Sequence, residues 1–188
     1  MVLSSAEIQK ALEDGRLVIN PVPGSAGTKS PYNTHSVDLT LGSEIVIPQP
    51  MTASIDLSES GSIATLISQN AQRRTATKDQ PYKLERGKFI LAQTKEVISL
   101  PITSALGARI EGKSSVARCG VLVHFTAPTV HPGFHGRLTL EMINLGPNVF
   151  SLSPDLPIAQ LIIEEVKGEL TPNDSQFQNQ MKPEGLKA

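Results

Sequence analysis

Residues 88–101 read KFILAQTKEVISLP and contain two short runs rich in β-forming residues, at 88–92 and 96–100. Similar short runs recur along the chain at 120–125, 137–143 and 158–166. Glycine, proline or asparagine interrupts nearly every gap between these runs. Many short strands separated by such residues are typical of an all-β sandwich or barrel, and this is the fold class that we expect.

The N-terminal part predicts one helix and one further strand. Ser4 and Glu7 have the spacing of a helix capping box, and Gly15 can end the helix that follows. We therefore expect a short amphipathic helix over residues 5–14. Residues 36–42 alternate polar and apolar side chains, which predicts a half-buried strand.

The length of the chain and its polar segments suggest its domain organisation. The 188 residues suit a single domain spanning 1–188. Residues 48–80 are largely polar, and we expect them to form an insertion or a lid. The tail 169–188 has few apolar residues, so it is expected to be mobile without a ligand or partner.

The composition limits the classes of function. A net charge of −1 gives no electrostatic basis for binding a nucleic-acid polymer, although one small phosphorylated ligand needs only a local site. Cys119 is the only cysteine, so neither a disulfide framework nor a cysteine-based metal site is expected. We recognise no signal peptide and no apolar run of about 18 residues, and therefore expect a cytoplasmic protein that does not span a membrane.

The segment EGKSSVAR, residues 111–118, has the composition of a phosphate-binding loop. A glycine lets the backbone approach a ligand, while basic and hydroxyl side chains supply charge and short donors. The side chains concerned are Lys113, Ser114, Ser115 and Arg118. The spacing is not that of a Walker A loop. On this motif alone, a solvated turn with a serine capping the next element remains the alternative.

The segment HFTAPTVHPGFHG, residues 124–136, is a loop rich in proline and glycine that contains three histidines, His124, His131 and His135. Three histidines raise the question of a metal site. The segment holds no carboxylate, and its prolines and glycines break any helical spacing of ligands. Polar lining of a pocket is therefore favoured over metal ligation.

The segment RLTLEMIN, residues 137–144, is expected to be a strand with a carboxylate on one face. Successive strand residues point to opposite faces. One face would carry Leu138, Leu140 and Met142, and the other Thr139, Glu141 and Ile143. A carboxylate among apolar residues would be partly buried, and burial would raise its pKa toward that of a general acid or base near neutrality. A glutamate on an edge strand that faces water is the alternative.

Taken together, these segments resemble the dCTP deaminase branch of the dUTPase superfamily. The family pattern joins Gly-[Arg/Lys]-Ser-Ser-x-x-Arg to His-x-Thr-Ala, a Pro-Gly-aromatic-x-Gly loop and Thr-Leu-Glu. These blocks stand here in the same order and spacing at 112–118, 124–127, 132–136 and 139–141. Further similar blocks are 15–21, 36–42, 160–162 and 175–180.

The resemblance implies a fold, an activity and an assembly. The fold is an all-β, dUTPase-like distorted jelly roll or β-barrel (a β-clip) with a short N-terminal helix. The activity is hydrolytic deamination of dCTP to dUTP and ammonia, with Mg²⁺ bound through the substrate triphosphate, no catalytic zinc, and dTTP as a candidate inhibitor. The assembly is a homotrimer with active sites between subunits.

The resemblance also assigns residues to roles. Glu141 would take a proton from the water that attacks C4 of cytosine and pass it on as ammonia leaves, while Ser114 and Arg118 hold the water, Glu141 and the base region. Phosphate contacts would come from Lys113, Ser114 and Ser115. The rest of the substrate-binding set is Ala127, Val130, His131, Thr139, Leu140, Gln176 and Gln180, and the last of these would close over the nucleotide.

Three departures from the family pattern accompany the resemblance. His131 stands where the family often has aspartate, which argues against strong diphosphatase activity. Gln176 and Phe177 replace lysine and tyrosine, and Asp155 replaces a glycine. Two alternatives follow: a dUTPase or a bifunctional enzyme that converts dCTP to dUMP and pyrophosphate, and a nucleotide-binding regulator without turnover.

Overall fold

The computed structural model describes residues 1–22, 24, 30–52, 54–56, 63–172, 175 and 177–187. Its helical elements are α1 (Ser5–Glu13), α2 (Ile63–Gln69), the 3-10 turn η1 (Ile102–Ser104) and α3 (Ser114–Ala117). Its strands are β1 (Val18–Asn20), β2 (Val37–Thr40), β3 (Glu44–Pro48), β4 (Ala71–Thr75), β5 (Tyr82–Leu84), β6 (Phe89–Ser99), β7 (Leu106–Gly112), β8 (Val121–Leu122), β9 (Thr129–Val130), β10 (His135–Asn144), β11 (Phe150–Leu152) and β12 (Pro157–Glu165).

The strands are arranged in antiparallel sheets. One sheet has the order β4-β3-β6-β10-β8, with β1 also paired to β6, and a second has the order β2-β12-β7-β9. A small sheet pairs β11 with β5. The expected all-β fold with a short N-terminal helix is therefore confirmed, and within the described residues the sheets stay open and do not close into a barrel.

The apolar core lies between the two larger sheets. Leu39 of β2, Leu140 of β10 and Leu161 of β12 are all fully buried. The alternation expected for 137–144 is confirmed, since buried and half-buried residues alternate along β10. Burial of these branched side chains supplies the main driving force for joining the sheets.

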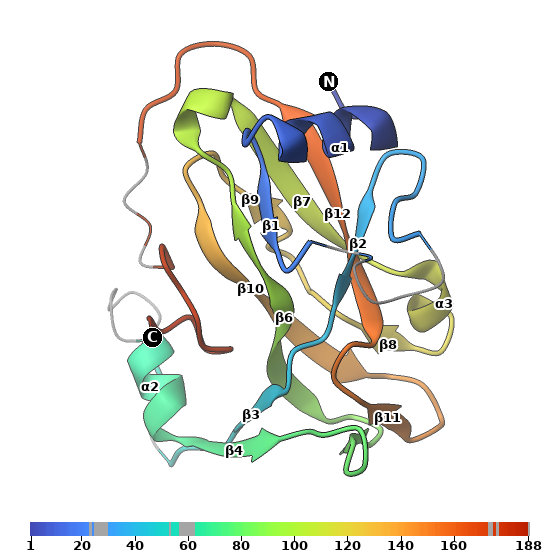
Figure 1. Ribbon diagram of the computed structural model, residues 1–188. Coiled ribbons are helices and arrows are strands. Elements are labelled where there is room, and N and C mark those ends of the chain that lie inside the picture. The colour runs from blue at the N-terminus through green and yellow to red at the C-terminus, as the bar shows by residue number, and fades with distance from the viewer. Residues whose placement is uncertain are drawn as a thin grey trace.

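Helix α1 forms as its capping sequence predicts. The Ser4 hydroxyl accepts a hydrogen bond from the backbone N–H of Glu7 at 3.3 Å, and Gly15 follows with φ of 69°. Ile8 and Ala11 form the buried face. Figure 1 shows α1 lying across the ends of strands β7 and β12. No helix in the described part of the chain is long and apolar enough to cross a membrane.

Strand β6 runs without a break through the residues that the sequence divides into two runs. Gln93 and Thr94 are polar but buried. The Thr94 hydroxyl donates to the Glu96 carbonyl at 2.8 Å and accepts from the Leu138 N–H at 3.0 Å. This second bond lies where the register with β10 shifts between Arg137 and Thr139. The Thr94 hydroxyl thus replaces a backbone partner for the Leu138 N–H at the register shift, and β6 continues past it.

Two segments that matter for function lie on different sides of the molecule. Strand β4 forms the edge of the larger sheet beside β3, and α2 packs near the C-terminal segment on one side (Figure 1). Helix α3, which carries Ser114 and Ser115 of the predicted phosphate-binding loop, lies on the opposite side (Figure 1).

Asp155 occupies the turn at which the family pattern has a glycine. Its φ is 68°, in the left-handed region that glycine adopts most easily. Lys95 and Lys78 both pair with its carboxylate. The hydrogen bond from Lys95 is the main reason why the pKa of Asp155 lies below its usual value.

Candidate active site

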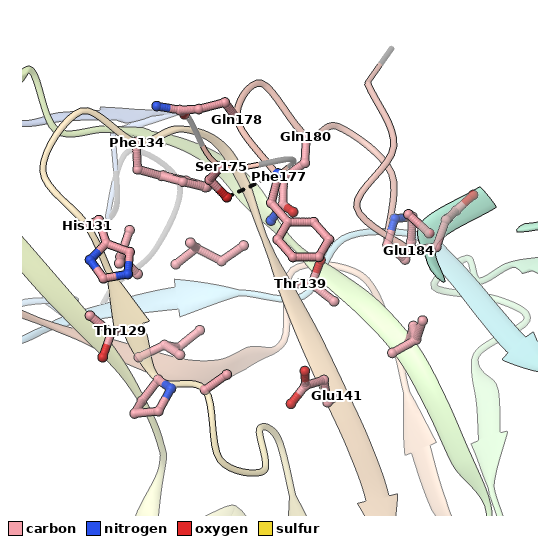
Figure 2. Close-up of a pocket in the computed structure, with 18 of the residues that line it drawn as sticks. Thr129, His131, Phe134, Thr139, Glu141, Ser175, Phe177, Gln178, Gln180 and Glu184 are labelled. Carbon is pink, nitrogen blue, oxygen red and sulfur yellow. Dashed lines mark hydrogen bonds between the residues drawn. The ribbon is translucent and has the colours of Figure 1, made fainter. Parts of the chain in front are cut away.

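A pocket of about 410 Å³ lies between the two larger sheets, under the C-terminal segment. Its floor comes from β10, one wall from residues 127–132, and the opposite wall from α2. The C-terminal segment, including Phe177 and Gln180, forms the roof (Figure 2). Most of the lining is apolar, and a few polar groups converge on it, as is typical of a small-molecule site.

Glu141 is the carboxylate on the floor of this pocket. It is half-buried on β10, on the same face as Thr139. Its Oε2 accepts a hydrogen bond from the backbone N–H of Phe125 at 3.2 Å. In the described part of the chain the other oxygen, Oε1, has no hydrogen-bond partner. One oxygen is thus anchored while the other is free to bind water or substrate.

The pocket brings together six residues that the sequence proposes. Ala127, Val130, His131, Thr139, Glu141 and Gln180 all line it. The Gln180 side chain donates to the Arg137 carbonyl at 2.6 Å, which fixes it at the edge of the roof. Figure 2 shows His131 and Thr129 on one side of the space and Thr139 and Glu141 on the other.

The predicted phosphate-binding residues are not part of this pocket in the single chain. Ser114, Ser115 and Arg118 are exposed on and beside α3. The Lys113 ammonium pairs with the carboxylate of Asp38 on β2. No lysine or arginine lines the pocket within the described residues, so neither kind of side chain is placed there, in the described part of the chain, to receive a triphosphate.

Two further predicted residues lie elsewhere. The Leu140 side chain is fully buried in the core, on the opposite face of β10 from Glu141. Gln176 lies outside the described residues.

The three histidines of the 124–136 segment do not form a cluster. His131 lines the pocket, whereas His135 is exposed at the start of β10. The Nε2 atom of His124 lies 3.5 Å from a carboxylate oxygen of Glu111. Among the described residues, no group of three or more histidine, cysteine or acidic side chains is placed to hold a metal ion.

The sequence indicated one wall of the pocket only in part, and it did not indicate part of the roof. Ile63, Ala64 and Ile67 of α2 line the pocket, and so does Glu184 of the tail. Only the apolar run from Ile63 to Ile67, inside a polar segment, signals that α2 packs against something. A single glutamate in a polar tail carries no signal of burial.

Comparison with known proteins identifies the family. The model of the dCTP deaminase-like family matches residues 2–166. The chain belongs to this family. Among its relatives, the dUMP-forming dCTP deaminase of Methanosphaera stadtmanae is 34% identical, over 87% of this chain and 78% of its own length. The dCTP deaminase of Haloarcula marismortui is also 34% identical, over 100% of this chain and 94% of its own length.

A solved structure shows the same fold. A 2′-deoxycytidine 5′-triphosphate deaminase from Agrobacterium tumefaciens matches with a TM-score of 0.65 and 17% identity. The match covers 86% of this chain and 47% of that one, so this chain spans about half the length of that structure.

Proposed function

We propose that this protein deaminates dCTP hydrolytically to dUTP and ammonia, and that Glu141 transfers the protons. The observation that carries the proposal is the placement of Glu141, whose side chain lines the pocket and whose Oε2 is held by the Phe125 N–H at 3.2 Å. A carboxylate held in this way can act as a general base without reorienting. Membership of the dCTP deaminase-like family and relatives named dCTP deaminase support the same reaction.

The chemical step is a hydrolysis that needs one group to move two protons. Glu141 takes a proton from water as the water oxygen bonds to C4 of cytosine. The resulting tetrahedral intermediate loses its amino group as ammonia when a proton reaches that nitrogen. The C4 hydroxyl then gives up its proton, which ends on N3, leaving the carbonyl and the N3–H of uracil. Glu141 would carry each of these protons, because its carboxylate would lie beside C4 of the bound cytosine throughout the reaction.

We further infer that the complete site needs a second copy of the chain. The described lining of the pocket has no lysine or arginine. Ser114, Ser115 and Arg118 are exposed on and beside α3, and α3 lies on the opposite side of the molecule from α2 and the C-terminal segment (Figure 1). A homotrimer would bring the α3 segment of one subunit to the pocket of another. The triphosphate of the Mg²⁺–dCTP substrate would then meet hydroxyl, backbone and guanidinium donors there.

One incubation tests the reaction. The protein is mixed with dCTP and Mg²⁺, and ammonia, dUTP and pyrophosphate are measured separately. Ammonia and dUTP in equal amounts are the expected result. The absence of ammonia despite tight dCTP binding would leave a dUTPase or a nucleotide-binding regulator and would overturn the proposal.

Pyrophosphate decides the alternative reaction. Relatives with this level of identity include enzymes named dCTP deaminase and enzymes named dUMP-forming. His131, a residue of the pocket wall, stands where the family often has aspartate, and this favours release of dUTP. Pyrophosphate formed in step with ammonia would instead show that the protein makes dUMP.

A further inference from the structure

The C-terminal segment is attached to the start of β10 by its backbone. Gln180 pairs with Gly136 in a parallel bridge, and the Arg137 N–H donates to the Gln180 carbonyl at 3.0 Å. The Asn179 N–H donates to the His135 carbonyl at 2.8 Å. These bonds fix the part of the roof that contains Gln180.

Beyond Gln180 the chain makes a tight turn whose tip is buried. The Met181 N–H donates to the Leu186 carbonyl at 2.8 Å, and the Gly185 N–H donates to the Lys182 carbonyl at 2.9 Å. Gly185 lies directly against the ring of Phe177, since a Cβ there would be 2.6 Å from Phe177 Cδ1. The turn therefore packs against Phe177 and supports it in the roof.

The carboxylate of Glu184 at the tip of this turn is tied to β4. Its side chain is 0% exposed and forms an ion pair with the guanidinium of Arg73 through two contacts. In the longer of the two, Nη1 of Arg73 lies 3.5 Å from Oε2 of Glu184. The Arg73 guanidinium also donates to the hydroxyl of Ser68 on α2 at 2.8 Å. Figure 2 shows Glu184 on the α2 side of the pocket, near Phe177 and Gln180. The ion pair thus connects the α2 wall to the roof.

We propose that Arg73 and Glu184 are positioning residues for nucleotide binding. Their ion pair holds the 181–186 turn against Phe177 and keeps the roof of the pocket in place. Neither side chain has to touch the reacting atoms. The effect on dCTP kinetics rests on the proposed function, but the effect on the roof itself does not.

The two partners differ in exposure, and this makes the proposal sharply testable. Arg73 is 45% exposed and can be hydrated when it loses its partner, whereas Glu184 is 0% exposed. Removing Arg73 leaves the buried carboxylate of Glu184 without a positive partner, and an unpaired buried charge strongly destabilises the folded state. Removing the charge of Glu184 leaves an arginine that water can solvate. Arg73→Ala is therefore expected to be more harmful than Glu184→Gln.

The experiment compares Arg73→Ala, Glu184→Gln, the double variant and the matched control Arg74→Ala, which removes the neighbouring arginine of β4. The first readout is hydrogen exchange of the Asn179 and Met181 amides, and the second is KM and kcat for ammonia release. Arg73→Ala should speed exchange and raise KM by about tenfold or more, with kcat changed less than about threefold, because it loosens binding and leaves the chemical groups in place. Arg74→Ala should change neither readout.

The double variant gives the decisive comparison. Because Glu184→Gln removes the buried charge that Arg73→Ala leaves uncompensated, the double variant should have a lower KM and slower tail exchange than Arg73→Ala alone. Additive effects in the double variant, or unchanged exchange and KM in Arg73→Ala, would overturn the proposal. Glu184→Gln keeps the shape of the side chain, so it remains informative if Arg73→Ala does not fold. If the unmodified protein released no ammonia, the proposed function would fail, while tail exchange would still decide the role of the pair.

Discussion

Glu141 is oriented by a backbone N–H donor, and the partner is Phe125. A backbone donor from a loop in contact with the same strand holds the carboxylate without neutralising it. The pattern of 137–144 is enough to predict which face Glu141 shares, because strand alternation is a local property. The pattern does not place Phe125 beside Glu141, since that contact depends on how the loop after β8 returns to β10.

Lys113 illustrates a residue whose partner could not be predicted from its motif. Its ammonium pairs with Asp38, 75 positions away in the chain, which also accepts a hydrogen bond from the Asn33 amide at 2.9 Å. A triphosphate must compete with this carboxylate for the lysine. The motif identifies Lys113 as a cation near a glycine turn but says nothing about which strand lies beside it.

Lys113→Ala is expected to weaken dCTP binding by roughly 1.5–3 kcal/mol, the usual contribution of a charge-assisted hydrogen bond. Isothermal titration calorimetry with Mg²⁺–dCTP measures the change. Asp38→Asn is the matched variant, because it removes the competing carboxylate and should not weaken binding. Equal losses in both variants would mean that the pair supports the fold and that Lys113 does not bind phosphate.

At the scale of the elements, β6 contains a buried acid that the proposed chemistry does not use. Glu96 is almost fully buried and accepts hydrogen bonds from the Thr40 N–H at 3.0 Å and the Thr40 hydroxyl at 2.6 Å. Burial raises the pKa of Glu96 above its ordinary value, and the bonds from Thr40 only partly oppose this. The two runs at 88–92 and 96–100 predicted strands here, but no local pattern shows that Glu96 would be buried and bonded to the half-buried Thr40 of β2.

Glu96 should make stability depend on pH. Because the pKa of Glu96 is raised in the folded state, Glu96 contributes to the free energy of unfolding. This contribution is fully present below the ordinary glutamate pKa of 4.5 and is lost as the pH rises through the pKa of the folded state. Glu96→Gln should remove this loss, which is at most about 1.4 kcal/mol per pH unit. Urea unfolding of both proteins across a pH series measures the difference. Parallel pH profiles would show that Glu96 titrates alike in the folded and unfolded chains.

Gly136 explains why the family's Pro-Gly-aromatic-x-Gly loop ends on a glycine in this chain. Its φ is 147°, and a Cβ there would lie 2.6 Å from the Gln180 carbonyl oxygen. The roof and β10 approach each other too closely for any side chain. The sequence marks the glycine, but the reason for it lies more than 40 residues further along the chain.

Gly136→Ala should therefore displace the roof while leaving the sheets intact. The expected loss of stability is about 1 kcal/mol or more, because the native backbone does not fit a side chain. Hydrogen exchange should accelerate at the Asn179 amide and stay slow in β12. Gly168→Ala is a matched control, since its φ is also positive, at 112°, but a Cβ there meets nothing within 4 Å. Unchanged exchange at Asn179 would show that the roof tolerates the methyl group.

At the scale of the whole molecule, α2 and the C-terminal segment, which form one wall and the roof of the pocket, lie on the opposite side of the chain from α3 (Figure 1). The sequence predicts each segment well because each is a continuous motif. Whether two motifs meet within a chain or between chains depends on the fold and assembly, so spacing alone does not predict it. The resemblance supplied the expectation of a homotrimer, and the separation of the two segments is consistent with it.

Mixing inactive subunits tests the shared site. Glu141→Gln and Arg118→Ala should each be inactive alone, and light scattering should show both as trimers. When they are unfolded together and refolded in equal amounts, about a quarter of the sites should combine an intact Glu141 with an intact Arg118 from the neighbouring subunit. Recovery of ammonia release toward that fraction is the expected result. If mixing restored no activity although mixed trimers form, both residues would have to act within one chain.

Glu141→Gln tests the central claim most directly, by measuring ammonia release and dCTP binding in the same variant. The amide keeps the shape of the side chain and can still accept the Phe125 N–H, but it cannot take a proton from water at neutral pH. We expect ammonia release to fall by about 10²-fold or more while the dissociation constant for dCTP changes little. Turnover within about tenfold of normal, together with loss of activity in His131→Ala, would contradict the account and make His131 the group that activates water.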